Sequence, residues 1–289
     1  MEPRKQTIEL AGKTLTLETG VMAKQSSGSV TVTYGETVVL CTVNAEREPK
    51  KGINFFPLSV EYRERFYAGG KIPGGYFKRE GRPGEKEILS ARLTDRPIRP
   101  LFPKEFQCET QVMINLLSSD QENPADILGT IGTSVALLLS DIPWNGPVAS
   151  VRLGLIDGKP IINPTFEQIS EGRLDLVMTG TKDAIIMMEA EAKELSEDEI
   201  LTAVQYGHEV IRDVIKFQIE FVKGISKTKR ETILPSYDEK VVDIISKKVN
   251  SEIPTLIGDS DKTDRRSKVD TFKSEIIGLI EEDFPENTS

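Results

Sequence analysis

The sequence is poor in cysteine and histidine. Its 289 residues include two cysteines, Cys41 and Cys108, and a single histidine, His208. Two cysteines this far apart, with no CxxC pair, exclude a disulfide scaffold and a cysteine zinc site. A single histidine excludes zinc motifs that need two, such as HExxH, and permits a Ser-His-Asp triad only if His208 itself is the histidine.

Long apolar runs are also missing. No run of about 18 apolar residues occurs, and the first residues, MEPRKQTIEL, lack the apolar stretch of a secretory signal. The composition, 38% hydrophobic and 29% charged, is still sufficient for a buried core. We therefore expect a soluble, cytoplasmic protein with no membrane partner, and the length suggests about two domains.

Positive charge is scarce overall but concentrated in one segment. The chain has 37 Lys and Arg against 46 Asp and Glu, a net charge of −9, which by itself argues against a nucleic-acid partner. Between Arg63 and Lys104, however, 11 residues are basic and 5 are acidic. Since only the local field acts within a Debye length of about 8 Å, this segment favours a phosphate-rich ligand. A solvated charged face remains the alternative.

Hydrophobic periodicity divides the chain into a mixed part and a helical part. Strands are predicted at 7–17, 29–43, 53–62, 111–117, 151–162, 175–178 and 185–189. Helices are predicted after Pro83, after an Asn123 N-cap, and from a Ser196–Glu199 capping box to about Lys223. Beyond Gly224 only two amphipathic helices follow, separated by a loop that includes Pro254 and residues 258–263. The pattern predicts an α+β fold, with mixed sheets packed under helices, followed by a small all-α domain.

The basic segment contains a loop with six glycines between Gly69 and Gly84, which favours sharp turns or a close approach to a ligand. The stretch from Phe66 to Pro103 includes this loop and reads FYAGGKIPGGYFKREGRPGEKEILSARLTDRPIRPLFP. This stretch resembles the first core domain of bacterial-type polynucleotide phosphorylase (polyribonucleotide nucleotidyltransferase). The similarity continues through 145–147, 174–181, 188–192 and 206–209. The resemblance implies a ribonuclease PH-like fold whose two parts span 1–147 and 148–223, with an incomplete all-helical domain at 235–289.

The resemblance also implies a function. The family degrades RNA from its 3′ end by phosphorolysis, with inorganic phosphate as co-substrate and Mg or Mn as the metal of the full-length enzyme. Its members carry two copies of the fold, form ring-shaped homotrimers and join RNA-degradation complexes. The present chain corresponds to the first copy, which we expect to guide single-stranded RNA (not DNA) and build the ring, while catalysis resides in the second copy. This chain alone is then expected to be inactive.

The positions that match the family's catalytic residues support that expectation. The serine-rich phosphate loop of the active copy is replaced here by Asn123-Pro124-Ala125-Asp126, where Pro124 removes a donor and Asp126 repels an anion. Of the metal-holding group only Asp175 survives, since Ile169 and Val177 occupy the other two positions. One carboxylate does not make a magnesium site. No catalytic and no metal-binding residue is expected in this half.

RNA contact is predicted from the aromatic and basic side chains. The loop that includes Phe77 matches the family's channel-entrance loop, where rings stack on bases and cations pair with phosphates. The predicted RNA-binding residues are Tyr76, Phe77, Lys78, Arg79, Arg82, Arg92, Arg96 and Arg99.

Several alternatives stay open. Phe77 could be a core residue, and the arginines at 92, 96 and 99 could pair with Glu87, Asp95 or a neighbouring subunit. Glu189 and Glu191 could be solvated, arginine partners or metal ligands, and His208 could be a hydrogen-bonded buried residue or a catalytic one. Two further functions remain: a stand-alone phosphorolytic exoribonuclease, and a non-catalytic RNA-binding ring subunit of an exosome-like assembly. We also expect the helices around 135–139 or 204–215 to leave apolar surface uncovered.

Overall fold

The chain forms two compact units, residues 1–233 and 234–289, in the computed structural model. Every strand of the described residues belongs to the first unit, and the second contains two helices. The structure describes residues 2–49, 53, 55–76, 79–232, 239–258 and 261–283.

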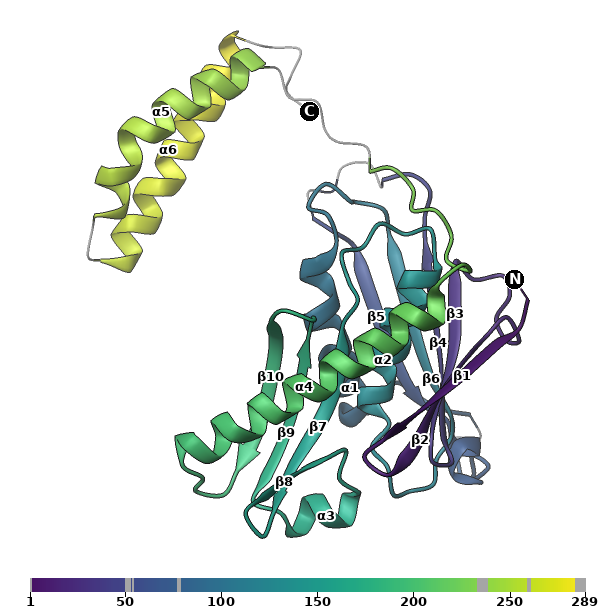
Figure 1. Ribbon diagram of the computed structural model, residues 1–289. Coiled ribbons are helices and arrows are strands. Elements are labelled where there is room, and N and C mark those ends of the chain that lie inside the picture. Colours follow the sequence, from purple (N-terminus) through teal and green to yellow (C-terminus); the bar gives the residue numbers. More distant parts are fainter. Residues whose placement is uncertain are drawn as a thin grey trace. The chain divides into compact units, whose positions relative to one another are not determined.

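A six-stranded sheet opens the first unit (Figure 1). Its strand order is β1-β2-β3-β4-β6-β5, and all neighbours are antiparallel except the parallel pair β5 and β6. The first two predicted hairpins are confirmed, whereas the strand expected from Ile53 begins only at Leu58. The bounds are β1 Arg4–Leu10, β2 Lys13–Thr19, β3 Gly28–Tyr34, β4 Thr37–Ala45, β5 Leu58–Glu64 and β6 Thr110–Ser118.

A second, four-stranded antiparallel sheet has the order β10-β9-β7-β8. The predicted hairpin of β7 and β8 turns at Asp157 and Gly158, both with positive φ (49° and 73°), as a tight hairpin turn requires. The bounds are β7 Ala149–Ile156, β8 Lys159–Ile162, β9 Leu174–Gly180 and β10 Ile185–Ala192.

Helix α2 (Asp126–Leu139) belongs to the core of both sheets, because it contacts β3 and β4 of the first and β7 of the second. Twelve of its 14 residues are buried, including the polar side chains of Thr130, Thr133 and Ser134. Gly132 lets it approach the first sheet closely: a Cβ there would lie 2.4 Å from Cys41 Sγ. Cys41 is buried, and burial raises the pKa of its thiol to about 12, which agrees with a packing role.

Two more helices complete the first unit. Helix α1 (Glu85–Ile98) packs against β5 and α2, and helix α4 (Glu197–Val222) packs along β7, β8 and β9 (Figure 1). The Ser196 capping box is confirmed, since its hydroxyl accepts the Glu199 N–H while the Glu199 carboxylate accepts the Ser196 N–H. The expectation of uncovered apolar surface is wrong for 135–139, whereas the 204–215 part of α4 leaves Tyr206 42% exposed. Side chains such as Val135 and Ile211 are buried within this unit itself.

The second unit is a pair of helices, α5 (Glu239–Ile257) and α6 (Lys262–Asp283), which contact each other. Pro254, expected in the loop, lies instead in the last turn of α5. In the part of the chain that the structure describes, no helix has both the length and the apolarity that a membrane crossing requires.

Candidate functional site

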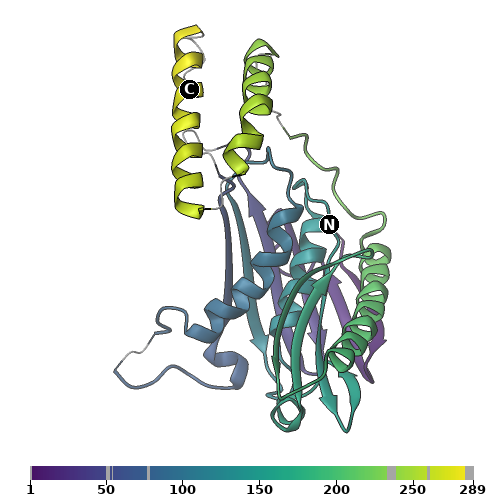
Figure 2. The same cartoon turned by 90° about the vertical axis from the view of Figure 1, so that its left-hand side faces the viewer.

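The glycine-rich loop connects the short helix η1 (Phe66–Gly69) to α1 within the first unit, and Figure 2 shows it extending away from the sheets. Its two ends are tied together. Arg65 Nη1 lies 2.5 Å from Glu80 Oε2, and Glu80 Oε1 accepts the Phe66 N–H at 2.9 Å. Arg63 Nη2 donates to the Gly81 carbonyl at 3.0 Å. The hydrogen bond from Arg65, followed by that from Phe66, lowers the pKa of Glu80, so this carboxylate holds the base of the loop in its charged form.

The described residues in the outer part of the loop include exposed side chains. Tyr76 is 94% exposed, and Arg79 and Arg82 are exposed with no hydrogen-bond or ion-pair partner within the described residues. Phe77 and Lys78 lie outside the described residues. An exposed ring with unpaired cations nearby is the combination that stacks on bases and pairs with phosphates.

Helix α1 starts directly after this loop and is fixed to the first sheet. Glu87, in its first turn, accepts the Gly84 N–H at 2.6 Å and the Glu64 N–H at 2.9 Å. A carboxylate at a helix N-terminus also suits the helix dipole. Glu87 therefore joins the end of the loop and the start of α1, the helix that carries the arginines, to strand β5.

The three arginines after the loop differ in what they contact. Arg92 has no hydrogen-bond or ion-pair partner in the described part of the chain. Arg96 pairs with Glu189 of β10 at 2.5 Å, which is the arginine-partner role left open for that glutamate. Arg99, in the short helix η2 (Arg99–Leu101), pairs with Asp95 through two hydrogen bonds of 3.0 Å, one of the alternatives to RNA contact.

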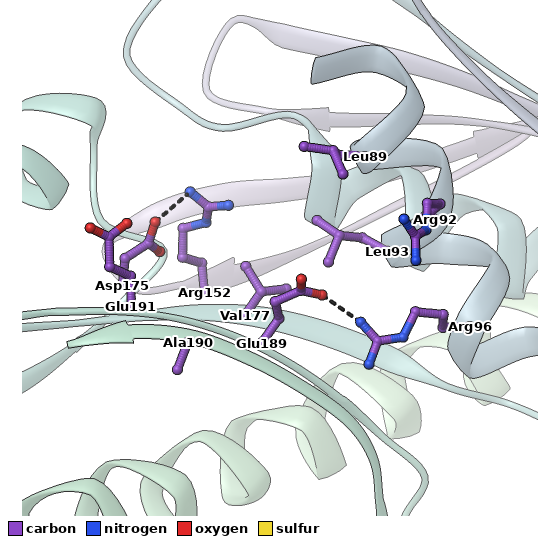
Figure 3. Close-up of a pocket in the computed structure, with 10 residues that line it drawn as sticks. All are labelled: Leu89, Arg92, Leu93, Arg96, Arg152, Asp175, Val177, Glu189, Ala190 and Glu191. Atoms are coloured by element: carbon purple, nitrogen blue, oxygen red, sulfur yellow. Dashed lines mark hydrogen bonds and ion pairs between the residues drawn. The ribbon is translucent and has the colours of Figure 1, made fainter. Parts of the chain in front are cut away.

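Arg92 and Arg96 line a hollow of about 310 Å³ between α1 and the second sheet (Figure 3). Acidic side chains face them from β9 and β10, and apolar ones form the rest of the wall. The lining residues are Leu89, Arg92, Leu93, Arg96, Arg152, Asp175, Val177, Glu189, Ala190 and Glu191.

Arg152 of β7 occupies the inner wall of this hollow and pairs with two carboxylates. Its Nη2 lies 2.8 Å from Asp126 Oδ2, and its Nη1 lies 3.4 Å from Asp175 Oδ2. Burial raises the pKa of Asp175, although Arg152 opposes the shift, while Asp126 and Glu191 reinforce it. Sequence reasoning missed Arg152, and the available signal was a lone charge within the apolar strand Ala149–Ile156.

The N-terminus of α2 differs from the expectation. Asn123 is not its N-cap, because the helix begins at Asp126 with Ala125 as the capping residue, and no side chain caps it. The Asn123 side chain instead bonds to Asp120 at 2.5 Å and to Lys13 at 2.7 Å. Asp126 bears a negative charge at the helix end, as expected, and that charge is already paired with Arg152.

These residues do not fit a divalent metal. Asp175 shares Arg152 with Asp126, Val177 is apolar and buried, and Ile169 lies on the separate short helix α3 (Phe166–Glu171). No cluster of three or more His, Cys, Asp or Glu side chains suited to a metal ion occurs among the residues described. His208 is half-buried, and its Nε2 lies 3.0 Å from the Thr181 carbonyl, which agrees with the hydrogen-bonded one of its two alternatives.

The comparisons with known proteins agree with this architecture. The model described as "3' exoribonuclease family, domain 1" matches residues 11–143, and "domain 2" matches 146–210. The crystal structure of rice Rrp46 shares the fold at 15% identity (TM-score 0.54), covering 75% of this chain and 92% of that one. A structure titled "archaeoglobus fulgidus exosome with RNA bound to the active site" does so at 18% identity (TM-score 0.55), covering 75% and 89%. The α+β class and the ribonuclease PH-like fold are confirmed.

The chain belongs to the 3′ exoribonuclease family. Within it, the predicted resemblance to polyribonucleotide nucleotidyltransferase is confirmed. The chain is 48% identical over 280 residues to that enzyme of Heliobacterium modesticaldum and 49% identical over 272 residues to that of Thermomicrobium roseum. These alignments cover 97% and 94% of this chain but 40% and 34% of the relatives, so the chain spans well under half of their length.

Proposed function

We propose that this chain is the RNA-guiding, ring-building half of a phosphate-dependent 3′-to-5′ exoribonuclease, a polyribonucleotide nucleotidyltransferase. In this proposal residues 1–147 and 148–223 form the two parts of the first ribonuclease PH-like domain, and 235–289 begin a helical domain. The chemistry takes place in a second core domain, because in the hollow beside α1 Asp175 pairs with Arg152 and Glu189 with Arg96, and the described residues supply no metal ligand set.

The exposed loop is the observation that carries the proposal. Its base is held by Arg65, Glu80 and Arg63, while Tyr76 and Arg79, the latter without a partner among the described residues, lie in the outer part. Binding through such a surface does not depend on sequence, because every base has a ring face and every nucleotide a phosphate. Phe77 and Lys78 complete the proposed contact set, with Arg82 and Arg92 as further cations that have no partner among the described residues. Arg96 and Arg99 would have to release internal partners first.

For the whole protein we propose inorganic phosphate as co-substrate, Mg or Mn as the metal, a homotrimeric ring, partners in RNA degradation, and a cytoplasmic location. The residues described here would hold neither the metal nor the attacking phosphate. They would bind the RNA strand and orient it.

A second candidate is a non-catalytic RNA-binding subunit of an exosome-like ring. It is favoured by the shared fold with the two chains from rice and Archaeoglobus fulgidus. The two candidates differ in where the catalytic site resides, on the same polypeptide or on a separate chain. A stand-alone phosphorolytic exoribonuclease is the third, and it requires a working site that the Asp126, Ile169 and Val177 positions do not provide.

RNA binding tests the proposal directly. Fluorescence anisotropy with a labelled single-stranded RNA, repeated over a salt series, should show a log–log slope that falls by up to about 1.4 when Lys78 and Arg79 are both replaced by Ala. Phe77→Ala should weaken binding by roughly 1–3 kcal/mol through lost stacking. The matched control is Lys24→Ala with Lys159→Ala, two exposed lysines without partners in the described structure.

Two outcomes would contradict the proposal. Unchanged affinity after replacing Phe77, Lys78 and Arg79 together would leave a scaffold that does not touch RNA. Release of nucleoside diphosphate from a 3′-tailed RNA, on adding magnesium and inorganic phosphate to the 289-residue chain, would instead favour the stand-alone exoribonuclease.

A further inference from the structure

The arginines of the α1 region are held to three different degrees. Arg92 is unpaired in the described part of the chain, and Arg96 has a single acidic partner. Arg99 is clamped by both oxygens of Asp95 and by the carbonyls of Phe56 and Leu58. The number of internal partners that a phosphate would have to displace therefore increases from Arg92 through Arg96 to Arg99.

Arg96 is the intermediate case, and its partner is Glu189. The two side chains come from α1 and β10, and their ion pair crosses the hollow (Figure 3). Arg96 is 48% exposed and Glu189 58% exposed, so water reaches both groups. Exposed ion pairs contribute no more than about 1 kcal/mol, which means that another anion can displace this carboxylate.

We propose that Glu189 is an internal competitor for RNA phosphate at Arg96, so that RNA gains this contact only by displacing the Glu189 carboxylate. The inference rests on the proposed function, since it needs an RNA strand that runs from the loop along α1. Glu189 thereby sets how strongly this arginine contributes to RNA affinity. It is a residue that limits RNA affinity at the site, and it performs no chemistry.

Neighbouring charges determine where the strand can go. Beyond Glu189 the hollow is bounded by Glu191 and Asp175, and its one inner cation, Arg152, is already shared by two carboxylates. A phosphate that displaced Glu189 would pair with Arg96 at the rim and meet negative charge further in. Arg92 and Arg96 therefore offer the RNA a path along the outside of the hollow.

Glu191 provides a matched control. It lies two residues further along β10 and lines the same hollow, and its side chain makes no hydrogen bond or ion pair within the residues described. Glu191→Gln removes the same charge from the same strand without releasing an arginine. Any difference in RNA affinity between Glu189→Gln and Glu191→Gln is therefore due to the ion pair with Arg96, because both substitutions remove the same negative charge from the hollow.

The experiment is a double-mutant cycle on the full 289-residue chain, with the anisotropy assay and labelled single-stranded RNA. Glu189→Gln should tighten binding at low salt two- to fivefold more than Glu191→Gln, and should increase the salt slope by up to about 0.7. Arg96→Gln should weaken binding in the wild type, should weaken it more in the Glu189→Gln background, and should abolish there the gain from Glu189→Gln. Emission of the single Trp144 verifies that each variant is folded.

Equal effects of the two glutamate substitutions, or additive effects of Arg96→Gln and Glu189→Gln, would overturn the inference. Failure of the proposed function would look different. In that case the Phe77, Lys78 and Arg79 variants would bind RNA as the wild type does, whatever the glutamate variants show.

Discussion

Replacing Arg152 by Met should destabilise the first unit substantially. The substitution keeps most of the aliphatic volume but removes the guanidinium that Asp126 and Asp175 share. Breaking a buried ion pair by removing one partner costs about 3–5 kcal/mol, because the other charge is left uncompensated. Arg152 and Asp126 are 13% and 14% exposed and Asp175 is 29% exposed, so we expect a loss near the lower end, about 3 kcal/mol. Against a typical stability of about 5–15 kcal/mol, that loss is large.

Urea unfolding followed by the emission of Trp144 measures this loss. Trp144 is the only tryptophan, is buried, and donates its indole N–H to the Ile98 carbonyl at 3.0 Å, so it reports on the core of the first unit. Lys216→Met is the control, because it breaks an exposed pair with Asp213 and should cost less than about 1 kcal/mol. Neutralising both carboxylates as Asn in the Arg152→Met background should recover most of the loss. A loss below about 1 kcal/mol for Arg152→Met would refute the argument.

Two further predictions concern proton uptake and packing. Because burial raises the pKa of Asp175, the folded chain takes up this proton at a higher pH than the unfolded chain, where aspartate titrates near 3.8. Stability from this group therefore increases as the pH falls from the raised value towards 3.8, and Asp175→Asn should remove that increase from the urea midpoint measured against pH; an unaltered profile would contradict this. Gly132→Ala should cost about 1–3 kcal/mol in urea unfolding, because its Cβ would meet Cys41 Sγ at 2.4 Å. Gly278→Ala, which has open space on α6, should be neutral or stabilising by up to about 1 kcal/mol, and equal effects of the two would count against the close approach.

Local patterns predicted the secondary structure well where neighbours in the sequence decide it. The β1–β2 and β3–β4 hairpins alternate apolar and polar residues around a turn, and the Ser196 capping box needs only a residue three positions away. The prediction that Asn123 caps α2 was wrong, and the reason lies outside the few neighbouring residues that a capping pattern considers. Its side chain is held by Lys13, 110 residues earlier, as well as by Asp120. A capping pattern cannot show that a distant cation binds the capping oxygen.

The candidate site shows the same limit more strongly. Arg152 pairs with Asp126 and Asp175, 26 and 23 residues away, and Arg96 pairs with Glu189 at a separation of 93 residues. Only the sheet order brings these charges together. The aromatic and basic loop could be identified from the sequence because its residues are contiguous. The sequence could not show which of the neighbouring arginines lack a partner in the described structure, because their partners lie on strands β5 and β10.

Helix α2 has a consequence for how the chain folds and how it can be divided. The two family matches meet at residues 143–146, yet α2, in the first match, is covered on one side by β7 from the second. A helix with twelve of its 14 residues buried would expose apolar side chains to water if one side were left uncovered. We therefore expect residues 1–147 expressed alone to aggregate, because the two segments acquire stability only together, in one cooperative transition. The boundary between the two family matches then separates two regions of sequence similarity, but it does not separate two units that fold independently.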